Sequence, residues 1–373
     1  MPSIGLLSTY PPTPCGLANF SAALVDGLSA NGSQVNVVRV ADGAPSCSAR
    51  VVGELINGSP ASVARCADLL NRSDVAIIQH EFGIYGGADG DEVIDILGML
   101  VIPSIVVLHT VPREPTSHQR SVLESVMRMA GDVVVMSEAA GALLRTQFGA
   151  EHRVSMIPHG STAPTEAPGK RAGRPTLLTW GLLGPGKGVE RVIDSMKSLQ
   201  DLPGNPRYLI AGRTHPKVLA AEGEAYRDAR TEQAKRVGVA RSVSFDATYR
   251  STASLSALAQ ASALVVLPYD STEQVTSGVL VDAIASGRPV VATAFPHAVE
   301  LLGSGAGLVV PHDDQEAMTS ALRSVLNEPR MAGAMAAEAR RMAPAMAWPV
   351  IARSYQAVAQ LLMAKQAGLS WRR

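Results

Sequence analysis

The chain has 373 residues, of which 46% are hydrophobic and 18% are charged. Lysine and arginine together equal aspartate and glutamate together, at 33 each, so the formal net charge is zero. This composition excludes a disordered chain, and the charge balance gives no support for binding to nucleic acid or for strong attraction to anionic lipid. A chain of this length is typical of two domains.

The N-terminal sequence and the cysteines indicate in which cellular compartment the protein is expected. The first residues, "MPSIGLLSTYPP", have neither a basic segment nor a long apolar stretch, so they predict a buried strand rather than a signal peptide. No stretch reaches the roughly 18 apolar residues that a membrane span needs. The cysteines Cys15, Cys47 and Cys66 are widely spaced and odd in number, which is typical of a reducing cytosol. We therefore expect a cytoplasmic protein, with peripheral membrane contact left open.

Short apolar runs alternate with helical patterns through the first half of the chain. Nearly all residues of these runs are apolar, as in parallel strands covered on both faces. Residues 18–30, 116–130 and 138–148 have helical patterns, with Phe20, Ala23, Leu24 and Leu28 on one face of the first. The βαβ order predicts a doubly wound parallel sheet. The predicted strands are "SIGLLS", "QVNVVRV", "VAIIQH", "SIVVLH", "DVVVMS" and "VSMIP".

A segment rich in proline, glycine and charge, "STAPTEAPGKRAGRP", interrupts the alternation and predicts an interdomain linker. Afterwards strands and helices alternate again, with helices expected at 188–199, 216–237, 253–261, 277–286 and 314–327. The last stretch, 329–366, reads as helix only, broken by Pro344 and Pro349. The expected domains are 1–162, a linker at 163–175, 176–345 and a C-terminal helical segment at 346–373. The strands predicted in the second half are "TLLTW", "RYLIAG", "SVSF", "ALVVLP", "PVVAT" and "GLVVP".

Ligands of open parallel sheets bind outside the carboxyl ends of the strands, so polar residues just after the apolar runs are the candidates. Gly16 follows the first strand where a helix begins, and its missing Cβ would let a phosphate or sugar approach; a plain strand-to-helix turn is the alternative. His80 and Glu81 end the third strand before a glycine-rich loop. His109 ends the fourth strand, where it could bond a sugar hydroxyl or a phosphate.

Two further features of the first half are interpreted as structural rather than functional. Asp89-Gly90-Asp91 has the spacing of a metal-binding D-x-D, but loops often hold two acidic residues and no strand directly precedes this one. We therefore expect no metal site. His159, in "IPHG", lies at the expected domain junction and is interpreted as structural.

The stretch "GLLGPGKG" at 181–188 follows a predicted strand and precedes a helix. The N–H groups of such a loop and the positive end of the helix dipole favour a phosphate, and Lys187 adds a full charge. Gly181, Gly186 and Lys187 fit the P-loop spacing, but Gly188 replaces the Ser or Thr that would hold Mg²⁺. Arg213 ends the next strand and could bind a phosphate through two hydrogen bonds; a surface ion pair is the alternative.

The last polar cluster is "STEQVTSGVLVDAIASGRPVVAT". Glu273 and Gln274 fall in a loop after a strand, and "SGVLVDAIASG" predicts a helix whose first N–H groups point to the ligand. Asp282 lies two turns along this helix, where a carboxylate could accept hydrogen bonds from a ribose diol.

With these motifs in place, the chain resembles the retaining GT-B glycosyltransferases of family four. "YPPTPCGLANF" is similar to the N-terminal glycine loop of that family, and "LHT" to its strand-end histidine. "GLLGPGKG" is similar to its diphosphate motif, and the segment from Glu273 to "GRPVVAT" to its acidic pair and the strand that follows. "GAGLVVPHDD" is similar to its closing strand and helix start, so the likeness runs nearly end to end.

The resemblance implies a GT-B fold: two Rossmann-like doubly wound domains facing a central cleft, with C-terminal helices crossing back. It implies transfer of a hexose from a nucleotide-diphosphate sugar to a hydroxyl acceptor with retention of configuration. No protein-bound metal and no cofactor are expected. In this scheme His109, Lys187 and Arg213 are catalytic, and His80 and Glu81 lie on the acceptor side. The donor-binding residues are Gly16, Gly181, Gly186, Glu273, Gln274, Thr276, Ser277, Gly278 and Asp282.

Several positions depart from the family pattern. Leu182 stands where the family has a phosphate-binding Arg, and we expect Arg213 to supply the missing charge. Gln274, rather than Glu, lies eight residues before Asp282, so either Gln274 contacts the donor sugar or a small shift brings Glu273 into place. Thr276, Ser277 and Gly278 would then direct backbone N–H groups to the diphosphate. Cys15 takes the place of a loop glycine.

Other functions remain as alternatives. A P-loop NTPase would need a hydroxyl at position 188. A GT-B epimerase would act on the nucleotide sugar without an acceptor, and a phosphorylase of the glycogen type would need a lysine carrying pyridoxal phosphate, for which no matching context is present. The departures at Leu182 and Gln274 also fit a sugar-nucleotide binding protein without catalysis.

Overall fold

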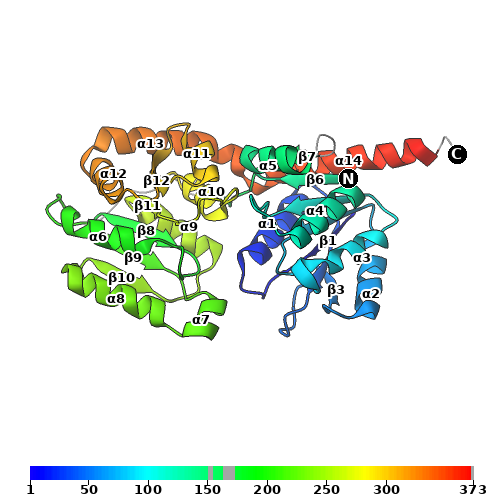
Figure 1. Cartoon of the computed structure of the whole chain (residues 1–373). Helices are drawn as coiled ribbons and strands as arrows, with labels where there is room; N and C mark the ends of the chain where they lie inside the picture. The colour runs from blue at the N-terminus through cyan, green and yellow to red at the C-terminus, as the bar shows by residue number, and fades with distance from the viewer. Residues whose placement is uncertain (150–153, 163–172, 371–373) are drawn as a thin grey trace. The chain divides into compact units, whose positions relative to one another are not determined.

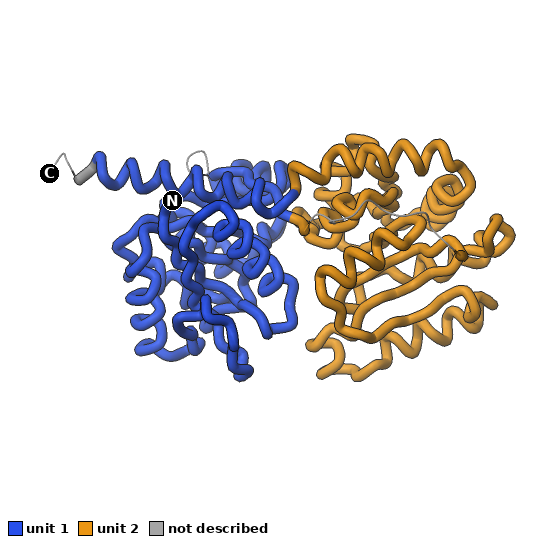
Figure 2. The backbone as a smooth tube through the Cα atoms, turned by 180° about the vertical axis from the view of Figure 1, so that it is seen from behind, with its two compact units in different colours: residues 1–160, 347–373 blue, residues 161–346 orange. Residues whose placement is uncertain are grey.

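The computed structural model describes residues 1–149, 154–162 and 173–370. The chain forms two compact units (Figures 1 and 2). Unit 1 combines residues 1–160 with 347–373, and unit 2 is residues 161–346. Most of the segment expected as a linker, residues 163–172, lies outside the described residues.

Unit 1 is built on a parallel sheet of seven strands in the order β3-β2-β1-β4-β5-β6-β7. Chain order reverses between β1 and β4, so the crevice at their carboxyl ends is the place where such sheets bind ligands. The strands are β1 Ile4–Ser8, β2 Val35–Val40, β3 Val51–Leu55, β4 Val75–His80, β5 Ser104–Leu108, β6 Asp132–Val135 and β7 Val154–Met156.

The helices of unit 1 cover both faces of this sheet (Figure 1). On one face α1 lies beside α14, which comes from the far end of the chain, and on the other α2, α3 and α4 lie side by side. The helices are α1 Gly16–Ala30, α2 Pro60–Leu70, α3 Glu92–Gly98, α4 Ser117–Met129, α5 Glu138–Phe148 and α14 Trp348–Ser370, with a short 3-10 turn η1 at Ala88–Gly90.

Unit 2 has a parallel sheet of six strands in the order β10-β9-β8-β11-β12-β13, with its own reversal between β8 and β11. Alternate residues of these strands enter two separate hydrophobic clusters: Leu177 and Val266 join one, and Leu178 and Val265 join the other. The strands are β8 Thr176–Trp180, β9 Arg207–Ala211, β10 Val243–Asp246, β11 Leu264–Leu267, β12 Val290–Thr293 and β13 Gly307–Val310.

The two clusters of unit 2 are closed by different helices: α6, α8 and α12 on one face, and α9, α10 and α11 on the other. Several helices begin at a Ser or Asp whose side chain accepts a first-turn N–H, as at Ser251, Ser277 and Asp314. The helices are α6 Val189–Leu199, α7 Pro216–Glu222, α8 Ala225–Val237, α9 Thr252–Ala261, α10 Gly278–Ala285, α11 Pro296–Leu302, α12 Gln315–Asn327 and α13 Pro329–Met342, followed by the 3-10 turn η2 Ala343–Met346.

The predicted pair of doubly wound parallel sheets is confirmed, with corrections to single elements. The sequence pattern did not predict β3, α2, α3 or α11. The helix expected over 216–237 is two helices, because Gly223 adopts a left-handed φ of 63° after α7. Pro349 does not break a helix; it is the second residue of α14, where a proline lacks no needed hydrogen bond.

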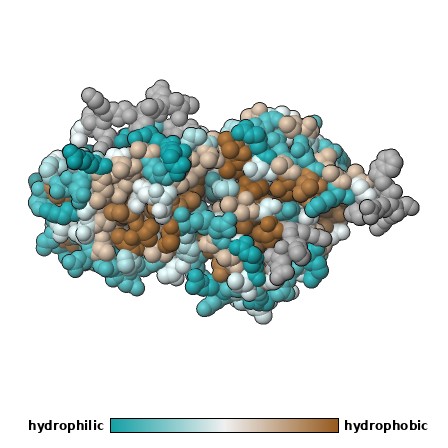
Figure 3. Space-filling view, turned by 90° about the horizontal axis from the view of Figure 1, so that it is seen from above, coloured by the Kyte–Doolittle hydropathy of each residue, from teal (hydrophilic) through white to brown (hydrophobic). Residues whose placement is uncertain are grey.

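The surface of both units carries apolar side chains among polar ones (Figure 3). Exposed large apolar residues include Met156 and Leu361 in unit 1 and Val299 in unit 2. None of the helices in the described part of the chain is both long enough and apolar enough to cross a membrane.

Candidate active site

The candidate donor site lies in unit 2, where two loops leave neighbouring strands at the reversal of the sheet. One loop, residues 181–188, follows β8, and the other, residues 268–277, follows β11. The two loops are joined directly, since the N–H of Asp270 donates to the carbonyl of Gly186 at 3.0 Å. Both of the motifs that the sequence assigns to a nucleotide sugar therefore meet at one crevice of the sheet.

The glycines of the first loop are dictated by its backbone. Gly181, Gly186 and Gly188 have φ values of 121°, 88° and 62°, which L side chains rarely adopt. A Cβ on Gly188 would lie only 1.7 Å from the carbonyl oxygen of Pro268. Serine or threonine cannot occupy this position in this conformation. The structure thus gives a physical reason against the P-loop interpretation.

Lys187 is half-buried and lies over an aromatic ring. Its Nζ is 4.5 Å from the centroid of the Tyr269 ring. In the described part of the chain no carboxylate pairs with this ammonium, and burial lowers its pKa. The charge is therefore held without being neutralised, which suits a group that is to bind an anion.

Arg213 lies next to the glycine loop through its backbone. The N–H of Leu183 donates to the carbonyl of Arg213 at 2.9 Å, and the N–H of His215 donates back to Leu183 at 2.8 Å. The guanidinium stacks over Tyr249 at 4.9 Å, and its Nε is buried with no partner among the described residues. The backbone pairing brings Arg213 beside the position of Leu182, and its role as the replacement charge stays a prediction.

The start of α10 offers fewer N–H groups than expected. The N–H of Ser277 donates to Nδ1 of the buried His297 at 2.8 Å, so it is not free for a diphosphate. Ser277 Oγ caps the helix by accepting from the N–H of Leu280. For the N–H groups of Gly278 and Val279, the described residues supply no acceptor. Unpaired N–H groups at a helix start can donate to an anion, so the expected diphosphate contact is narrowed to these two groups and stays a prediction.

Glu273 and Gln274 differ in their surroundings. Glu273 is exposed, and its N–H donates to Ser271 Oγ at 3.3 Å. Gln274 is half-buried, and its Nε2 donates to the carbonyl of Thr276 at 3.1 Å. Thr276 Oγ1 is buried with no partner among the described residues. The structure thus places Gln274 in the packed part of the loop and Glu273 on its exposed part.

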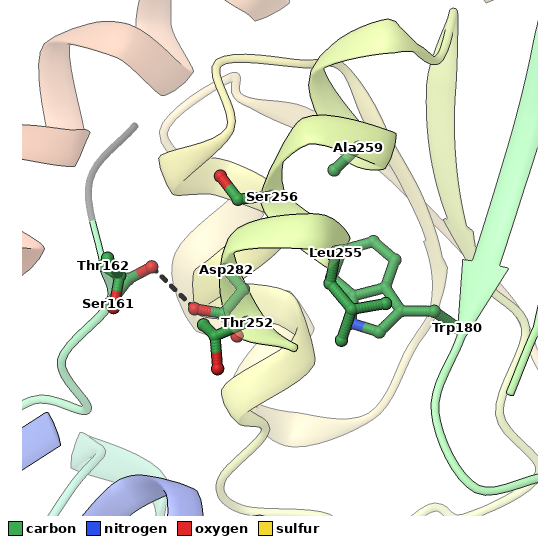
Figure 4. Close-up of a pocket in the computed structure, with 8 residues that line it drawn as sticks. All are labelled: Ser161, Thr162, Trp180, Thr252, Leu255, Ser256, Ala259 and Asp282. Atoms are coloured by element: carbon green, nitrogen blue, oxygen red, sulfur yellow. Dashed lines mark hydrogen bonds between the residues drawn. The ribbon is translucent and has the colours of Figure 1, made fainter. Parts of the chain in front are cut away.

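Asp282 lines a small pocket in unit 2 (Figure 4). Its Oδ1 accepts a hydrogen bond of 2.6 Å from Ser161 Oγ. Burial raises the pKa of this carboxyl to about 6, and the bond from Ser161 opposes the rise. Ser161 thus occupies an oxygen that was expected to bind a ribose diol. The pocket is lined by Ser161, Thr162, Trp180, Thr252, Leu255, Ser256, Ala259 and Asp282.

In unit 1, Gly16 is the first residue of α1. Cys15 caps the helix, with its Sγ accepting from the N–H of Ala18 at 3.3 Å. A Cβ on Gly16 would meet no described atom within 4 Å, so the space beside it is open. The loop before it is fixed by the buried Arg39, which donates to the carbonyl of Tyr10 at 3.1 Å and to Thr13 Oγ1 at 2.9 Å.

His109 follows β5 and contacts two residues that the sequence analysis did not assign. Its Nε2 lies 2.6 Å from Gln79 Oε1, an atom that only accepts, so Nε2 carries the proton and Nδ1 is an acceptor. The Phe20 ring lies edge-on at 4.8 Å. Burial lowers the pKa of His109 to about 3, with smaller contributions from His159 and His80. The imidazole is therefore neutral at physiological pH and suited to accept a bond from a hydroxyl.

His80 and Glu81 end β4 but differ in access. The His80 side chain is fully buried, neither ring nitrogen has a partner among the described residues, and burial lowers its pKa to about 4. The structure does not bring His80 to a surface where an acceptor could contact it. Glu81 is half-buried, and its Oε2 accepts from Thr110 Oγ1 at 2.5 Å.

The glycine-rich loop after β4 is attached to its neighbours. Glu92 accepts from the N–H groups of Gly58 at 2.7 Å and Gly86 at 3.1 Å. Asp89 and Asp91 both face His118, at 3.0 and 3.5 Å. Within residues 1–149, 154–162 and 173–370, no group of three or more His, Cys, Asp or Glu side chains is arranged to hold a metal ion.

His159 is half-buried and packs against Phe20 and Trp348, beside the start of α14. Its ring is 5.0 Å from Phe20 and 5.6 Å from Trp348, and its Nδ1 lies 2.6 Å from the carbonyl of Gly160. Burial lowers its pKa to about 4. These contacts agree with a structural residue.

Comparison with known proteins shows which families and solved structures the chain is similar to. Residues 163–342 match the family described as glycosyl transferases group 1. A search of curated proteins finds no match. The matched range covers nearly all of unit 2, including the glycine loop, Lys187 and α10.

Solved structures resemble the whole chain at low sequence identity. Sucrose-phosphate synthase from Thermosynechococcus elongatus has a TM-score of 0.76 at 17% identity, covering 97% of this chain and 100% of that one. A glycosyltransferase from Rickettsia africae has a TM-score of 0.76 at 12% identity, covering 97% and 98%. HepE of Anabaena, solved with UDP and glucose, has a TM-score of 0.73 at 17% identity, covering 95% and 98%.

These structures share the fold of two Rossmann-like domains that the sequence resemblance implied. The family match covers the unit in which the sequence predicts the phosphate-binding residues. The chain has the GT-B fold, and residues 163–342 of its C-terminal unit are similar to the glycosyl transferases group 1 family.

Proposed function

We propose that the chain transfers a hexose from a nucleoside diphosphate sugar to a hydroxyl acceptor, with retention at the anomeric carbon and without a protein-bound metal. The observation that carries the proposal is the convergence of an unneutralised Lys187, the glycine loop and the start of α10 at one sheet crevice. HepE of Anabaena, solved with UDP-glucose, supports a nucleotide sugar as the donor. The expected cytoplasmic location is part of this proposal.

In this mechanism, the sugar–phosphate bond breaks as negative charge develops on the leaving diphosphate. Lys187, Arg213 and the N–H groups of Gly278 and Val279 stabilise that charge, which is the task that a metal ion would otherwise perform. The acceptor oxygen bonds to the anomeric carbon on the face that the diphosphate leaves, and the departing phosphate oxygen takes the hydroxyl proton. By its resemblance to the family histidine, His109 would hold a sugar hydroxyl.

Donor identity is tested by a thermal-shift screen against UDP, GDP and ADP and their glucose or mannose esters, because a bound ligand raises stability by mass action. The best donor is then incubated with candidate acceptors, and NMR of the product reads the anomeric configuration. Retention supports the proposal, and inversion contradicts it. Conversion of the nucleotide sugar without an acceptor would instead indicate an epimerase, and binding without any turnover would indicate a sugar-nucleotide binding protein.

Replacing Lys187 by Ala should lower the transfer rate by orders of magnitude, because the leaving diphosphate loses its nearest full charge. The measurement is kcat/KM with the donor found above. Lys217→Ala, at an exposed position on α7, is the matched control and should leave kcat/KM unchanged. Near-normal turnover of Lys187→Ala would exclude the assigned role.

A further inference from the structure

The residues that follow β11 pack against the glycine loop 181–188. Pro268 places its carbonyl against the Cα of Gly188, and the N–H of Asp270 bonds Gly186. Arg191 of α6 fastens this segment, since its Nη1 donates to the Pro268 carbonyl at 3.3 Å and pairs with Asp270. These contacts hold the segment 268–270 directly against the loop 186–188.

Tyr269 is the central residue of that segment, and its ring is buried and packed. The residue is 2% exposed, and the ring stacks on the buried Phe295 at 5.5 Å with an interplanar angle of 25°. Its carbonyl accepts from Thr293 Oγ1 at 2.7 Å. The ring cannot leave its place without disturbing the core of unit 2.

This fixed ring is the partner of the Lys187 ammonium, 4.5 Å from its centroid. An aromatic face attracts a cation through its quadrupole and carries no negative charge of its own. A carboxylate in the same place would hold the lysine more strongly, but it would compete with an incoming phosphate. A buried tyrosine ring restrains the ammonium and leaves its full charge available.

We propose that Tyr269 is a positioning residue for Lys187: its ring holds the ammonium in place beside the glycine loop before the donor diphosphate binds. The inference rests on the proposed function of Lys187 as a diphosphate ligand. The tyrosine hydroxyl is buried and bonds no described residue, so the proposal assigns the positioning to the ring. In this proposal only the aromatic ring restrains the Lys187 ammonium.

The test compares Tyr269→Phe, which keeps the ring, with Tyr269→Leu, which removes it, by calorimetric binding of UDP, GDP and ADP. For the nucleotide that binds the wild type, Tyr269→Phe should stay within about twofold, and Tyr269→Leu should bind about tenfold more weakly. Phe295→Leu is the packing control, since it disturbs the same core and keeps the ring over Lys187. It should bind more tightly than Tyr269→Leu.

A double-mutant cycle separates positioning from a merely structural effect. In the Lys187→Ala background, Tyr269→Leu should change nucleotide affinity by less than about twofold, because there is no ammonium left to position. An equal loss in both backgrounds would overturn the proposal, as would wild-type affinity in Tyr269→Leu.

A measurement without nucleotide tests the positioning role of Tyr269 independently of the proposed transferase function. Trace acetylation with acetic anhydride, read by peptide mass spectrometry, reports the accessibility of the Lys187 amine. Labelling should rise several-fold in Tyr269→Leu and stay at the wild-type level in Tyr269→Phe. Equal labelling in all three proteins would refute the positioning role even if nucleotides bind. Absence of nucleotide binding in the wild type would refute the proposed function alone.

Discussion

Gly188 shows how one backbone position decides between two phosphate-binding chemistries. The sequence "GLLGPGKG" differs from a P-loop only by a missing hydroxyl, and a single substitution would complete that motif. The structure shows that the substitution has no room, because the Pro268 carbonyl occupies the space of a side chain. The glycine is required by the loop that holds Lys187, independently of any metal.

Gly188→Ala should therefore both destabilise unit 2 and abolish nucleotide binding. Gly238→Ala in the same unit is the matched control: its φ of 81° and ψ of 21° are left-handed like the 62° and 17° of Gly188, but a Cβ there would meet nothing within 4 Å. The control should cost about 1–2 kcal/mol, the usual strain of a left-handed residue. Gly188→Ala should cost clearly more. Urea unfolding followed by fluorescence measures both, and equal costs would contradict the steric argument.

Individual site residues were predictable only where the signal is local in sequence. The glycines and Lys187 could be identified because strand, loop and helix follow one another within a short stretch. Tyr269, His297 and Gln79 could not, since each acts through a partner brought close by the fold: Lys187, Ser277 and His109. The contact of Ser161 with Asp282 was equally invisible, because it joins two segments far apart in the chain.

Helix α14 completes the core of unit 1. Its residues Ile351, Tyr355 and Ala359 are almost fully buried in the same cluster as Leu24 and Leu28 of α1. Trp348 packs at its start against Phe20, and a Cβ on Gly160 would lie 2.5 Å from the indole ring. The glycine is there to admit the tryptophan.

Trp348→Ala should lower the free energy of unfolding of unit 1 by about 3–5 kcal/mol, because a large buried ring leaves a cavity. Leu361→Ala on the same helix is the control, since Leu361 is 54% exposed and should change stability by less than about 0.5 kcal/mol. The change in stability is measured as the hydrogen-exchange protection of the β4 and β5 amides. Unchanged protection in Trp348→Ala would show that α14 adds little to this unit.

At the level of elements, long periodic segments were predictable and short ones were not. The buried strands of both sheets and the helices α1, α4 and α6 carry strong apolar patterns. In contrast, β3 alternates half-buried and exposed residues at the edge of its sheet, and α3 is only seven residues long. Such elements are specified by what they pack against, which a local pattern does not contain.

The whole molecule should respond to acid in opposite ways in its two units. His80, His109 and His159 in unit 1 have pKa values lowered by burial to about 4, 3 and 4, below the ordinary value of 6.5. Their contribution to stability is present above pH 6.5 and is lost as the pH falls toward 4, because the unfolded chain binds the protons first. Asp282 in unit 2 has a pKa raised to about 6, so its contribution is greatest below pH 3.8 and is lost as the pH rises through 6.

Hydrogen-exchange mass spectrometry between pH 7 and 4.5, corrected for intrinsic rates, can follow each unit separately. Protection of the unit 1 sheet should fall over this range, and His80→Leu should make the fall shallower. Asp282→Asn keeps an oxygen that accepts the Ser161 bond but removes the titration, so it should flatten the opposing dependence in α10. A parallel loss of protection in both units, unchanged in both variants, would contradict the assignment.

The division of unit 1 between the two ends of the chain imposes an order on biosynthesis. The α1 face that carries Phe20, Leu24 and Leu28 leaves the ribosome early, but the helix that covers it follows residues 161–346. At roughly 5–20 residues per second, synthesis of residues 161–346 alone takes about 10–40 seconds before α14 is made. Unit 2 is complete by then. The apolar α1 face is therefore the last part of the unit 1 core to be covered, and until then it exposes surface that is prone to aggregation.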